Sequence, residues 1–293
     1  MVSVIITTKN RKNFLYRAVE SVVANTLKPI DIIIVNDGGD RVEAEQFENS
    51  QGIKIDVINN LCSKGGNVAR NQGANCARGE LLFFLDDDDA FTPTSIASRA
   101  KCFENMSVGL AYTGKKLVKS ESLDEVYYVS KPKYEGDVIK PLFSLGNVIG
   151  TTSCVAVRKS VFESVGGFDE ELQALQDYDL WLRISAVCRV KHDHKANLIY
   201  TIHSTNNQVS SNYHRYLDAG NYLYNKYKLE LNELGLERKF LSLRYLRVAM
   251  IASKHSSLER LKYAIISLKY NFSIKGFFML IPVSISKKIR SFH

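Results

Sequence analysis

The sequence has few of the features that mark several large classes of protein. Its 293 residues include only five cysteines, which are scattered, odd in number and without a CxxC pair. This usage argues against a disulfide framework or a cysteine zinc site, and it suits a reducing cytosol. Only 5 residues are proline, and no internal repeat or low-complexity stretch is visible. With 45% hydrophobic residues, the chain can bury a substantial core in one large or two small domains.

Two nucleotide-binding fingerprints and the signature of a membrane span are also absent. There is no GxGxxG after the first apolar segment and no GxxxxGK[ST] anywhere, so the dinucleotide and P-loop classes lack their phosphate cradles. The apolar stretch at residues 276–283 is far shorter than the ~20 residues that a helix needs to cross a bilayer. Residues 2–8 run into a polar segment without a cleavage pattern, so we expect no secretory signal peptide.

Charge is spread unevenly along the chain. The whole sequence has a formal net charge of +8. Residues 211–293 hold 15 basic against 5 acidic side chains, a net of +10, and the remaining residues hold 24 against 26, a net of −2. A near-neutral body with a strongly basic end indicates an anionic partner surface, either membrane or nucleic acid.

Apolar segments alternate with helical patterns through about the first ninety residues. Dense apolar or β-branched runs at residues 2–8 and 81–85 predict buried strands, and those at 32–35 and 53–58 predict two further strands. The spacing of apolar residues predicts a helix from Asn10, and Gly65 and Gly66 open a second helix that reaches Ala77. This alternation predicts an α/β fold with a mostly parallel sheet flanked by helices.

Two of these strands end in acidic residues. Asp37 follows the second strand, and the run Asp86, Asp87, Asp88 and Asp89 follows the fourth. Open α/β sheets bind ligands in the crevice at the carboxyl ends of their strands, so both acidic ends should face one crevice. Packed carboxylates resist ionising, and a hard cation such as Mg²⁺ or Mn²⁺ relieves that cost while keeping positions open for phosphate. The alternative for the acidic run is a solvated turn.

The motifs that surround these acidic residues occur in the order of a known family. They are residues 4–11 (VIITTKNR), 35–39 (VNDGG), 65–71 (GGNVARN) and 85–89 (LDDDD), followed downstream by 165–170 (VGGFDE) and 176–183 (QDYDLWLR). With this order over residues 2 to about 205, the chain resembles the inverting family-2 glycosyltransferases, which have the GT-A fold. The resemblance implies a GT-A nucleotide-sugar-binding domain over residues 1–210.

The resemblance also implies roles on the donor side. Asp37 would hold the uracil or ribose of a UDP-sugar, and Arg70 would help to position the donor unless it is a solvated helix charge. Asp86 and Asp88 would be the two ends of a DxD-type motif; four consecutive Asp leave its register open by one residue, and we favour Asp88 as the ligand of Mn²⁺ or Mg²⁺. The implied nucleotide-sugar-binding residues are Thr8, Asn10, Arg11, Asp37, Arg70, Asp86 and Asp87, and the implied metal ligands are Asp88, Asp86 and His203. For His203, a purely structural role is the alternative.

On the acceptor side, Asp177 matches the family's catalytic base. Inverting transfer needs such a base, because the acceptor hydroxyl must lose its proton as it attacks the anomeric carbon. The family usually has Glu-Asp here, whereas this chain has Gln176 before Asp177. Thr152 and Ser153 match the segment that lines the acceptor side, although a plain turn is the alternative for them.

After Ser210 the resemblance fades and the sequence becomes basic and helical in pattern. Helices are predicted at residues 213–227, 240–252, 258–270 and 273–290. Apolar anchors beside the basic cluster at residues 286–290 suit a helix that lies in a membrane interface, with ordinary packing as the alternative. Residues 211–293 are therefore expected to form a helical extension that associates with an anionic membrane surface. No motif supports nucleic-acid binding.

Together these features predict an inverting, metal-dependent and non-processive hexosyltransferase. The Gln-x-x-Arg-Trp motif of processive members is absent. The resemblance to bacterial members of the family implies transfer of one galactose, glucose or N-acetylhexosamine from UDP to a polyprenyl-diphosphate-linked saccharide. It also implies a location at the cytoplasmic face of the membrane and a part in synthesis of O-antigen, capsule or a related polysaccharide. The alternatives are a sugar-nucleotide pyrophosphorylase, whose glycine-rich loop is missing after the first strand, and a non-catalytic sugar-nucleotide-binding module.

Overall fold

A computed structural model describes residues 1–47, 52–203 and 212–281, which form two compact units. The first unit comprises Met1–Ile139, Asn147–Glu171 and Gln176–Ser204. The second comprises Lys140–Gly146, Leu172–Leu175 and Thr205–His293. The sequence places a boundary after residue 210, in the stretch 204–211 that lies outside the described residues.

The first unit is built on a mixed sheet whose N-terminal half is entirely parallel. Strands β1 (Val2–Thr8), β2 (Asp31–Asn36), β3 (Lys54–Asn59) and β4 (Leu81–Asp86) lie in the order β3-β2-β1-β4. All three pairs are parallel. The four predicted strands and their direction are thus confirmed, because dense apolar runs such as that of β2 bury both faces of a strand.

The remaining strands add antiparallel pairs on the other side of β4. They are β5 (Ala90–Phe91), β6 (Val108–Lys119), β7 (Tyr128–Ser130), β8 (Val155–Arg158) and β9 (Arg189–Ile202). The order continues β4-β8-β6-β9-β5, with β7 beside β6. Strands β6 and β9 are parallel, whereas β8 is antiparallel to both of its neighbours.

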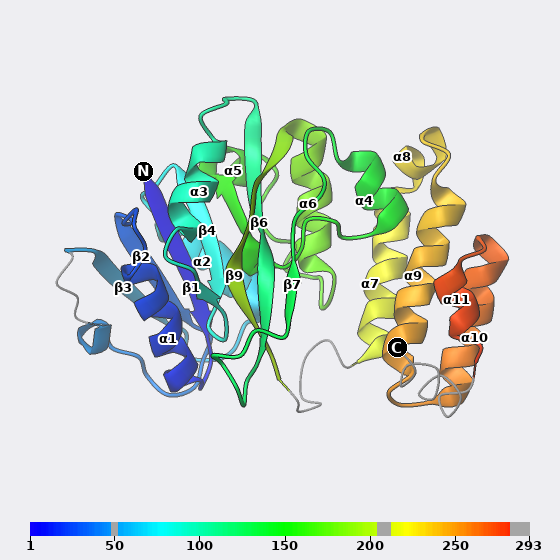
Figure 1. Cartoon of the computed structure of the whole chain (residues 1–293), viewed down its shortest axis with the longest axis horizontal. Coiled ribbons are helices and arrows are strands. Elements are labelled where there is room, and N and C mark those ends of the chain that lie inside the picture. Colours follow the sequence, from blue (N-terminus) through cyan, green and yellow to red (C-terminus); the bar gives the residue numbers. More distant parts are fainter. Residues whose placement is uncertain (48–51, 204–211, 282–293) are drawn as a thin grey trace. The chain divides into compact units, whose positions relative to one another are not determined.

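Helices cover both faces of this sheet. They are α1 (Lys12–Val23), α2 (Gly66–Cys76), α3 (Ser95–Cys102), α5 (Lys159–Ser164) and α6 (Gln176–Val187), with short 3₁₀ turns at Ala44–Phe47 and Thr152–Cys154. In Figure 1, α1 and α3 lie in front of the sheet and α2 lies behind it. Helix α2 sits so close that a Cβ on Gly73 would stand 2.4 Å from Ile5 Cγ2. The first helix starts at Lys12 rather than Asn10, since Asn10 has a left-handed backbone (φ 56°).

The second unit is helical. It holds α7 (Tyr213–Lys226), α8 (Lys228–Glu233), α9 (Glu237–Ala252), α10 (Ser257–Tyr270) and α11 (Ile274–Phe278), together with most of α4 (Ile139–Leu145). The first three helices predicted after Ser210 are confirmed. The fourth, predicted over residues 273–290, is wrong in length, because α11 ends at Phe278 and residues 279–281 form a turn. The basic cluster at residues 286–290 lies outside the described residues.

Apolar and aromatic contacts hold this helical unit together. The ring of Phe143, from α4, packs edge-on against Tyr227 and Phe240 at centroid distances of 5.7 and 6.0 Å. Phe143 and Leu142 are almost fully buried. The internal segment Lys140–Gly146 therefore contributes core residues to a unit whose other helices come from the end of the chain.

Candidate functional site

The carboxyl ends of β1, β2 and β4 meet at one edge of the sheet. The pairing register joins Thr8 to Asn36 and Thr7 to Asp86. Asp37 follows immediately, and its N–H donates to the Thr8 carbonyl at 2.9 Å. Asp86 to Asp89 form a tight turn, closed by the Asp89 N–H on the Asp86 carbonyl at 3.0 Å. The strand order thus brings the two acidic strand ends to the same edge.

Asp86 is paired with Arg70 from α2. Arg70 Nη2 lies 2.6 Å from Asp86 Oδ1, and the guanidinium also stands over the Phe168 ring at 5.5 Å. The Arg70 side chain is only 12% exposed, which excludes the alternative of a solvated helix charge. An arginine fixed beside a carboxylate at a strand end can meet a diphosphate through its remaining N–H groups.

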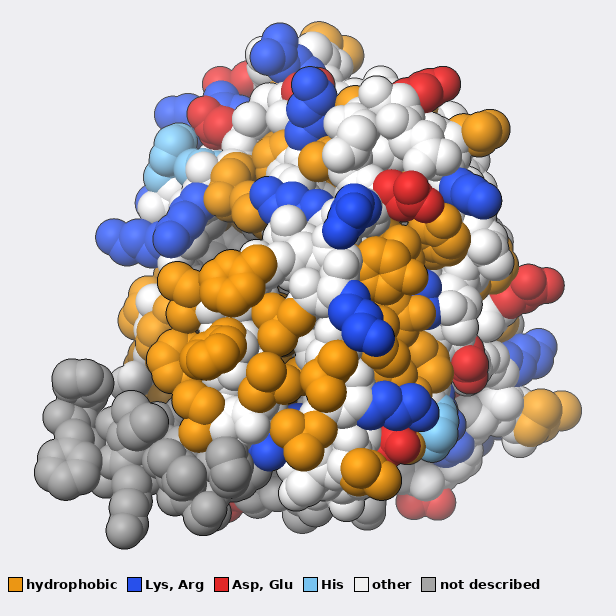
Figure 2. Space-filling view, turned by 90° about the vertical axis from the view of Figure 1, so that its right-hand side faces the viewer, with side chains coloured by type: hydrophobic (Ala, Val, Ile, Leu, Met, Phe, Trp, Pro, Cys, Tyr) orange, Lys and Arg blue, Asp and Glu red, His pale blue; other side chains and the backbone are white. Residues whose placement is uncertain are grey.

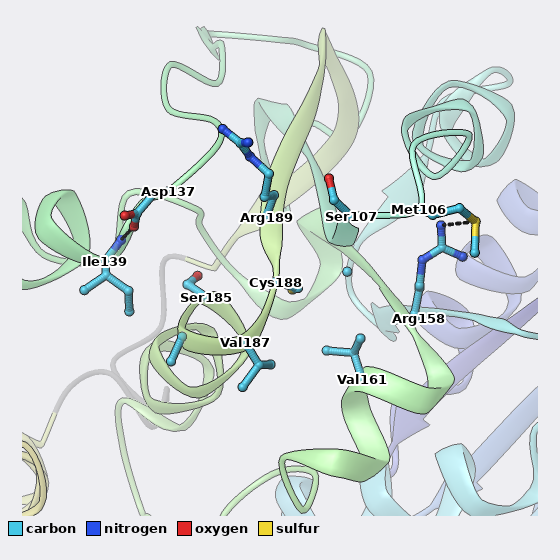
Figure 3. Close-up of a pocket in the computed structure, with 12 residues that line it drawn as sticks. Met106, Ser107, Asp137, Ile139, Arg158, Val161, Ser185, Val187, Cys188 and Arg189 are labelled. Atoms are coloured by element: carbon cyan, nitrogen blue, oxygen red, sulfur yellow. Dashed lines mark hydrogen bonds between the residues drawn. The ribbon is translucent and has the colours of Figure 1, made fainter.

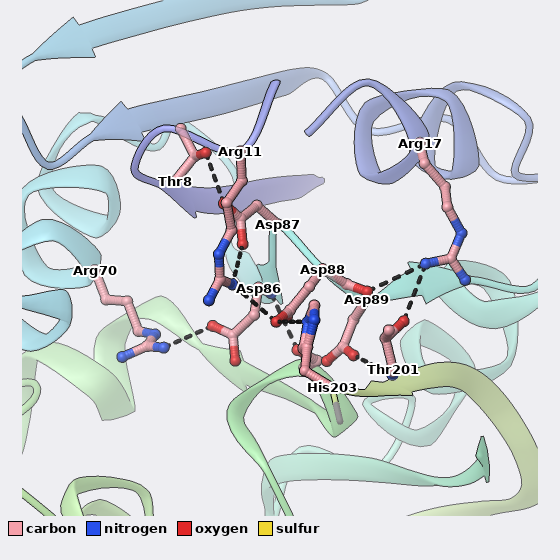
Figure 4. Close-up of polar contacts among 11 residues, drawn as sticks. Thr8, Arg11, Arg17, Arg70, Asp86, Asp87, Asp88, Asp89, Thr201 and His203 are labelled. Atoms are coloured by element: carbon pink, nitrogen blue, oxygen red, sulfur yellow. Dashed lines mark hydrogen bonds and ion pairs between the residues drawn. The ribbon is translucent and has the colours of Figure 1, made fainter. Parts of the chain in front are cut away.

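Asp88 is the carboxylate on which most positive groups converge (Figure 4). Arg11 Nη1 lies 2.8 Å and His203 Nε2 2.9 Å from Asp88 Oδ2. Arg17, from α1, donates to the Asp88 carbonyl at 3.1 Å and to the Thr201 hydroxyl at 3.1 Å. The side chains of Asp88 and His203 are partly accessible, at 17% and 15% exposure. Carboxylate oxygens are the ligands that Mn²⁺ and Mg²⁺ prefer, and the assignment of Asp88, Asp86 and His203 as ligands of such an ion stays a prediction.

Asp87 and Asp89 point away into buried surroundings. Asp87 accepts the Thr8 hydroxyl at 2.7 Å and also meets Arg11 at 3.1 Å. Burial raises the pKa of Asp87 to about 6, an effect that the Thr8 hydrogen bond and Arg11 partly offset. Asp89 accepts the Thr201 N–H at 3.0 Å, and burial together with the neighbouring charge of Asp88 raises its pKa well above the usual value. These two residues hold the turn in place, leaving Asp86 and Asp88 as its accessible carboxylates.

Asp37 organises the loop before α2. Its two carboxylate oxygens accept the Lys64 and Gly65 N–H groups at 2.8 and 2.9 Å and the Ser63 hydroxyl at 2.7 Å. Burial alone would raise the pKa of Asp37, but these bonds and that of Asn60 lower it on balance. The ionised carboxylate therefore fixes the start of α2, the helix that carries Arg70.

The loop after β1 is fixed by a second polar contact. Asn10 Oδ1 accepts the Asp40 N–H at 2.9 Å. A Cβ on Gly39 would stand only 2.1 Å from the same oxygen, and Gly39 has φ +104°, so the close approach requires glycine. Thr8 and Arg11 lie on either side of Asn10 in this loop, and both contact Asp87. Asn10 itself therefore acts on the loop rather than on the acidic turn.

The segment 147–154 links the acidic turn to Asp177. At one end, the Ser153 hydroxyl accepts the Asp86 N–H at 3.0 Å. At the other, Asn147 Nδ2 donates to Asp177 Oδ2 at 3.1 Å. Asn147 and Ser153 are six residues apart, which limits their Cα separation to about 20 Å. Thr152 and Ser153 are both buried, so they fix the position of the segment 147–154 rather than face the solvent.

Asp177 lies in the first turn of α6, next to Gln176, where the helix begins. The Tyr178 N–H donates to Asp177 Oδ1 at 2.7 Å, and Asn147 holds the other oxygen. Asp179, a second carboxylate two residues along the same helix, is fully buried and paired with Arg183 at 2.7 Å. Its Oδ2 is thus committed to Arg183 on the same helix, and its burial favours Asp177 as the residue that can reach a substrate.

Comparison with known proteins identifies the family of this chain. The family model described as glycosyl transferase family 2 matches residues 3–166. The chain belongs to glycosyl transferase family 2. An uncharacterized glycosyltransferase of Rickettsia prowazekii is 33% identical over 215 residues, covering 70% of this chain and 64% of the relative. One of Haemophilus influenzae is 32% identical over 187 residues, covering 63% and 62%, so the chain spans a little over six-tenths of these relatives. YwdF of Bacillus subtilis, also an uncharacterized glycosyltransferase, is 30% identical and is covered to 77%.

Solved structures share the fold of this chain. The mannosyltransferase PcManGT from Pyrobaculum calidifontis, in complex with GDP-Man and Mn²⁺, aligns with a TM-score of 0.60 at 12% identity, covering 95% of this chain and 82% of that one. S. aureus TarS in complex with UDP-GlcNAc aligns with a TM-score of 0.57 at 15% identity, covering 95% and 89%. The predicted GT-A fold, with its helical extension, is confirmed.

Three residues of the candidate site were not predicted from the sequence. Arg17 could have been suspected because an arginine near the apolar stripe of α1 needs a polar partner there. Thr201 and Asn147 carry no such signal, since a threonine in a strand and an asparagine in a loop are common. Their roles depend on long-range contacts, to Asp89 from Thr201 and to Asp177 from Asn147.

The first unit also contains a cavity of about 630 Å³ at the other end of the sheet (Figure 3). It is lined at the starts of β6 and β9 by residues that include Ser107, Arg158 and Arg189. Arg158 is already committed to the carbonyls of Val108 and Phe103, at 2.8 and 2.6 Å. The cavity is thus remote from the acidic turn, and we assign it no part in transfer.

Among the described residues, no helix combines the length and hydrophobicity needed to cross a bilayer.

Proposed function

We propose that the transferase moves one sugar from a UDP-sugar, with inversion, to a hydroxyl of a lipid-diphosphate-linked saccharide. The observation that carries this proposal is the convergence of the accessible carboxylates Asp86 and Asp88 with three basic groups at one strand edge. That arrangement suits a diphosphate bound through both a cation and arginines. Asp177, joined to the same edge by the segment 147–154, supplies the base.

The donor would lie along the loops after β1 and β2. Asp37 and the loop that it fixes would take the uracil or ribose, while Thr8, Asn10, Arg11 and Asp87 would shape the nucleotide pocket. Arg11 and Arg70 would contact the diphosphate. In support, the fold neighbours TarS and PcManGT are described in complex with UDP-GlcNAc and with GDP-Man. Galactose, glucose and N-acetylhexosamine are the sugars that we propose.

A Mn²⁺ or Mg²⁺ ion would be held by Asp88 and Asp86, with His203 beside them. When bound there, the cation would neutralise charge that develops on the departing diphosphate. Because Arg11 and His203 both contact Asp88 Oδ2, binding of the cation would compete with these two contacts. The fold neighbour PcManGT, whose structure was solved in complex with Mn²⁺, supports the choice of metal.

Asp177 would take the proton from the acceptor hydroxyl. The Tyr178 N–H and the Asn147 amide each hold one of its oxygens, which fixes the plane of the carboxylate. Both donors favour the ionised form, which is the form that a base needs. Thr152, Ser153 and Gln176 would border the acceptor, with the two buried hydroxyl residues acting through the position of the segment 147–154.

The helical unit would hold the enzyme at the cytoplasmic face of a membrane, where a polyprenyl-diphosphate acceptor is anchored. Figure 2 shows a face on which hydrophobic side chains gather beside lysines and arginines. Exposed apolar residues near the end of the described chain are Leu258, Ile265, Phe272, Ile274, Phe277 and Phe278. Apolar side chains among basic ones suit an anionic lipid surface. Such a location suits synthesis of O-antigen, capsule or a related polysaccharide.

The experiment that tests this function is a donor screen with a synthetic diphosphate-lipid saccharide, with and without Mn²⁺. We expect one UDP-hexose or UDP-N-acetylhexosamine to give a single-sugar product whose anomeric configuration, read by NMR, is inverted. The matched control is Asp56→Asn, which removes a carboxylate of β3 that pairs with Lys54 on the surface. Retention of configuration, or turnover that is independent of both Asp88 and Asp177, would rule the proposal out.

A further inference from the structure

Strand β9 carries a second group of potential metal ligands, well away from the acidic turn. Glu135, His192 and His194 each offer a ligand atom, and these atoms lie within 4.8 Å of one another. The two imidazole rings are edge-to-face with centroids 4.3 Å apart. His192 Nε2 faces Glu135 Oε2 at 3.8 Å. His192 and His194 are separated by one residue on β9, and the short distances among the three ligand groups place both rings beside Glu135.

The backbone on both sides of Glu135 is pinned. Gly136 and Val190 exchange two backbone hydrogen bonds, of 2.7 and 3.0 Å. The Tyr112 hydroxyl donates to the Tyr134 carbonyl at 2.6 Å and accepts the Tyr134 N–H at 3.1 Å. Glu135 therefore stands between two fixed neighbours, directly beside the histidine strand. Little backbone freedom remains to be lost when its carboxylate binds a ligand.

The histidine strand is fixed as well. Asp193, between the two histidines, turns its carboxylate away and accepts bonds from the Ser98 hydroxyl, Asn197 Nδ2 and Lys195 N–H at 2.7 to 3.0 Å. His194 has a left-handed backbone with φ 59°, which breaks the regular strand at this point. His192 is buried and its ring meets the edge of Tyr112 at 5.7 Å. The three side chains are thus presented by a framework of hydrogen bonds rather than by a free loop.

We propose that Glu135, His192 and His194 form a metal site for a borderline divalent cation, with Zn²⁺ as the expected ion. Two imidazoles and one carboxylate are a ligand set that zinc uses, with remaining positions taken by water. Imidazole suits zinc-type ions, whereas the oxygen ligands of the acidic turn suit Mn²⁺ and Mg²⁺. The ion would clip the segment before Gly136 to β9. It would therefore stabilise this edge of the first unit.

The site is separate from the proposed transfer site. His192 precedes Thr201 by nine residues on β9, a separation of up to roughly 30 Å along a strand. Thr201 contacts Asp89 at the acidic turn, whereas His192 lies toward the opposite end of the same strand. The proposal therefore does not depend on the transfer reaction, and the two sites can be tested independently.

Binding has an identifiable cost at His192. The His194 N–H lies 3.2 Å from His192 Nδ1, which acts as the acceptor. A metal ion on Nε2 requires the ring proton to sit on Nδ1, so this long contact would open. The site offers only three protein ligands, and metal binding breaks one hydrogen bond. We therefore expect the affinity for Zn²⁺ to be well below that of closed four-ligand zinc sites.

The test is titration of the full chain with Zn²⁺, and with Co²⁺ as a visible-absorption probe, in an Asp88→Ala background that disables the acidic turn. We expect one Zn²⁺ per chain and Co²⁺ ligand-field bands in this background, together with a higher unfolding temperature. His194→Ala and Glu135→Gln, both at exposed positions, should weaken binding by about tenfold or more, and His214→Ala should leave it unchanged.

Two results would overturn the proposal. The first is an affinity for Zn²⁺ that is the same in His194→Ala, in Glu135→Gln and in the Asp88→Ala protein from which they are made. That result would place the ion elsewhere. The second is an absence of Co²⁺ bands and of any Zn²⁺-dependent rise in unfolding temperature in the parental protein, which would make the cluster a hydrogen-bonded strand edge only. Because the two substituted side chains are exposed, misfolding is not expected to obscure the result, and circular dichroism checks it.

Discussion

The side-chain amide of Asn147 donates to Asp177 Oδ2 at 3.1 Å, and the same amide is held by the Gly150 backbone on both of its polar atoms. The Gly150 carbonyl also accepts the indole N–H of the buried Trp181, at 2.9 Å. Asn147 is therefore not a free loop residue. It is a rigid donor, aimed at the carboxylate that we propose as the base.

Asn147→Ala should lower kcat by about ten- to a hundredfold, the equivalent of one hydrogen bond to a charged group. Since the lost donor favours the ionised carboxylate, the acid limb of the pH–rate profile should move to higher pH. The measurement is kcat against pH, with Asn105→Ala as the control, because Asn105 caps a distant loop at Ser107. An equal loss of rate at every pH, with an unmoved acid limb, would contradict the positioning role.

Asp88→Ala and Asp177→Asn should separate donor binding from proton removal. Asp88→Ala should abolish transfer and weaken Mn²⁺-dependent UDP binding, because the metal loses its principal carboxylate. Asp177→Asn should lower transfer by about 10² to 10⁴-fold with UDP binding kept, because only the base is lost. Isothermal titration with UDP and Mn²⁺, beside an activity assay, distinguishes the two. Full activity in either variant would exclude the assigned role.

Asp37→Asn should change how stability depends on pH. The folded-state pKa of Asp37 is lowered, so its contribution to stability is present above the unfolded value of 3.8 and is lost as the pH falls through the folded value. At pH 7 we expect the variant to be less stable by about 1–3 kcal/mol, because an amide cannot accept all the donors of the loop. Urea unfolding at pH 7 and below pH 3.8 should show this gap shrinking in acid. A gap independent of pH would mean that packing, not charge, is lost.

The exposed apolar residues of α11 and of the segment just before it should bind the membrane. Replacing Phe272, Ile274 and Phe277 together by serine should release the protein from anionic vesicles, since each of these side chains is more than half exposed and could enter the lipid interface. Vesicle flotation measures the bound fraction. Tyr128→Ser, which alters a similarly exposed residue of the first unit, is the control. Equal flotation of the triple variant and its parent would favour a purely structural helix.

The strands and the acidic turn could be predicted because their signals are local. The apolar run of β4 ends in four carboxylates, and parallel pairing follows from strand and helix alternation. Sequence reasoning could not say which carboxylates are buried. That outcome depends on Thr8 and on Thr201, which approach the turn from β1 and β9.

Other features were beyond sequence reasoning because they join distant parts of the chain. Asn147 meets Asp177 across thirty residues, and Glu135 meets His192 across a much longer separation. Single histidines and asparagines carry no periodic signal that would link them. The short segments Lys140–Gly146 and Leu172–Leu175 also read as ordinary loop or helix, although they belong to the helical unit.

The membership of Lys140–Gly146 in the helical unit has a consequence for how the chain is made. Phe143 leaves the ribosome 97 residues (240 − 143) before Phe240, the ring that it packs against. At a synthesis rate of about 5–20 residues per second, roughly 5 to 20 s pass between the synthesis of Phe143 and that of Phe240. Phe143 and Leu142 lack their native packing partners during this time. During that interval the first unit can pair its strands, but the apolar face of α4 stays exposed. A nascent chain stalled before residue 240 should therefore be a better chaperone client than one stalled after it.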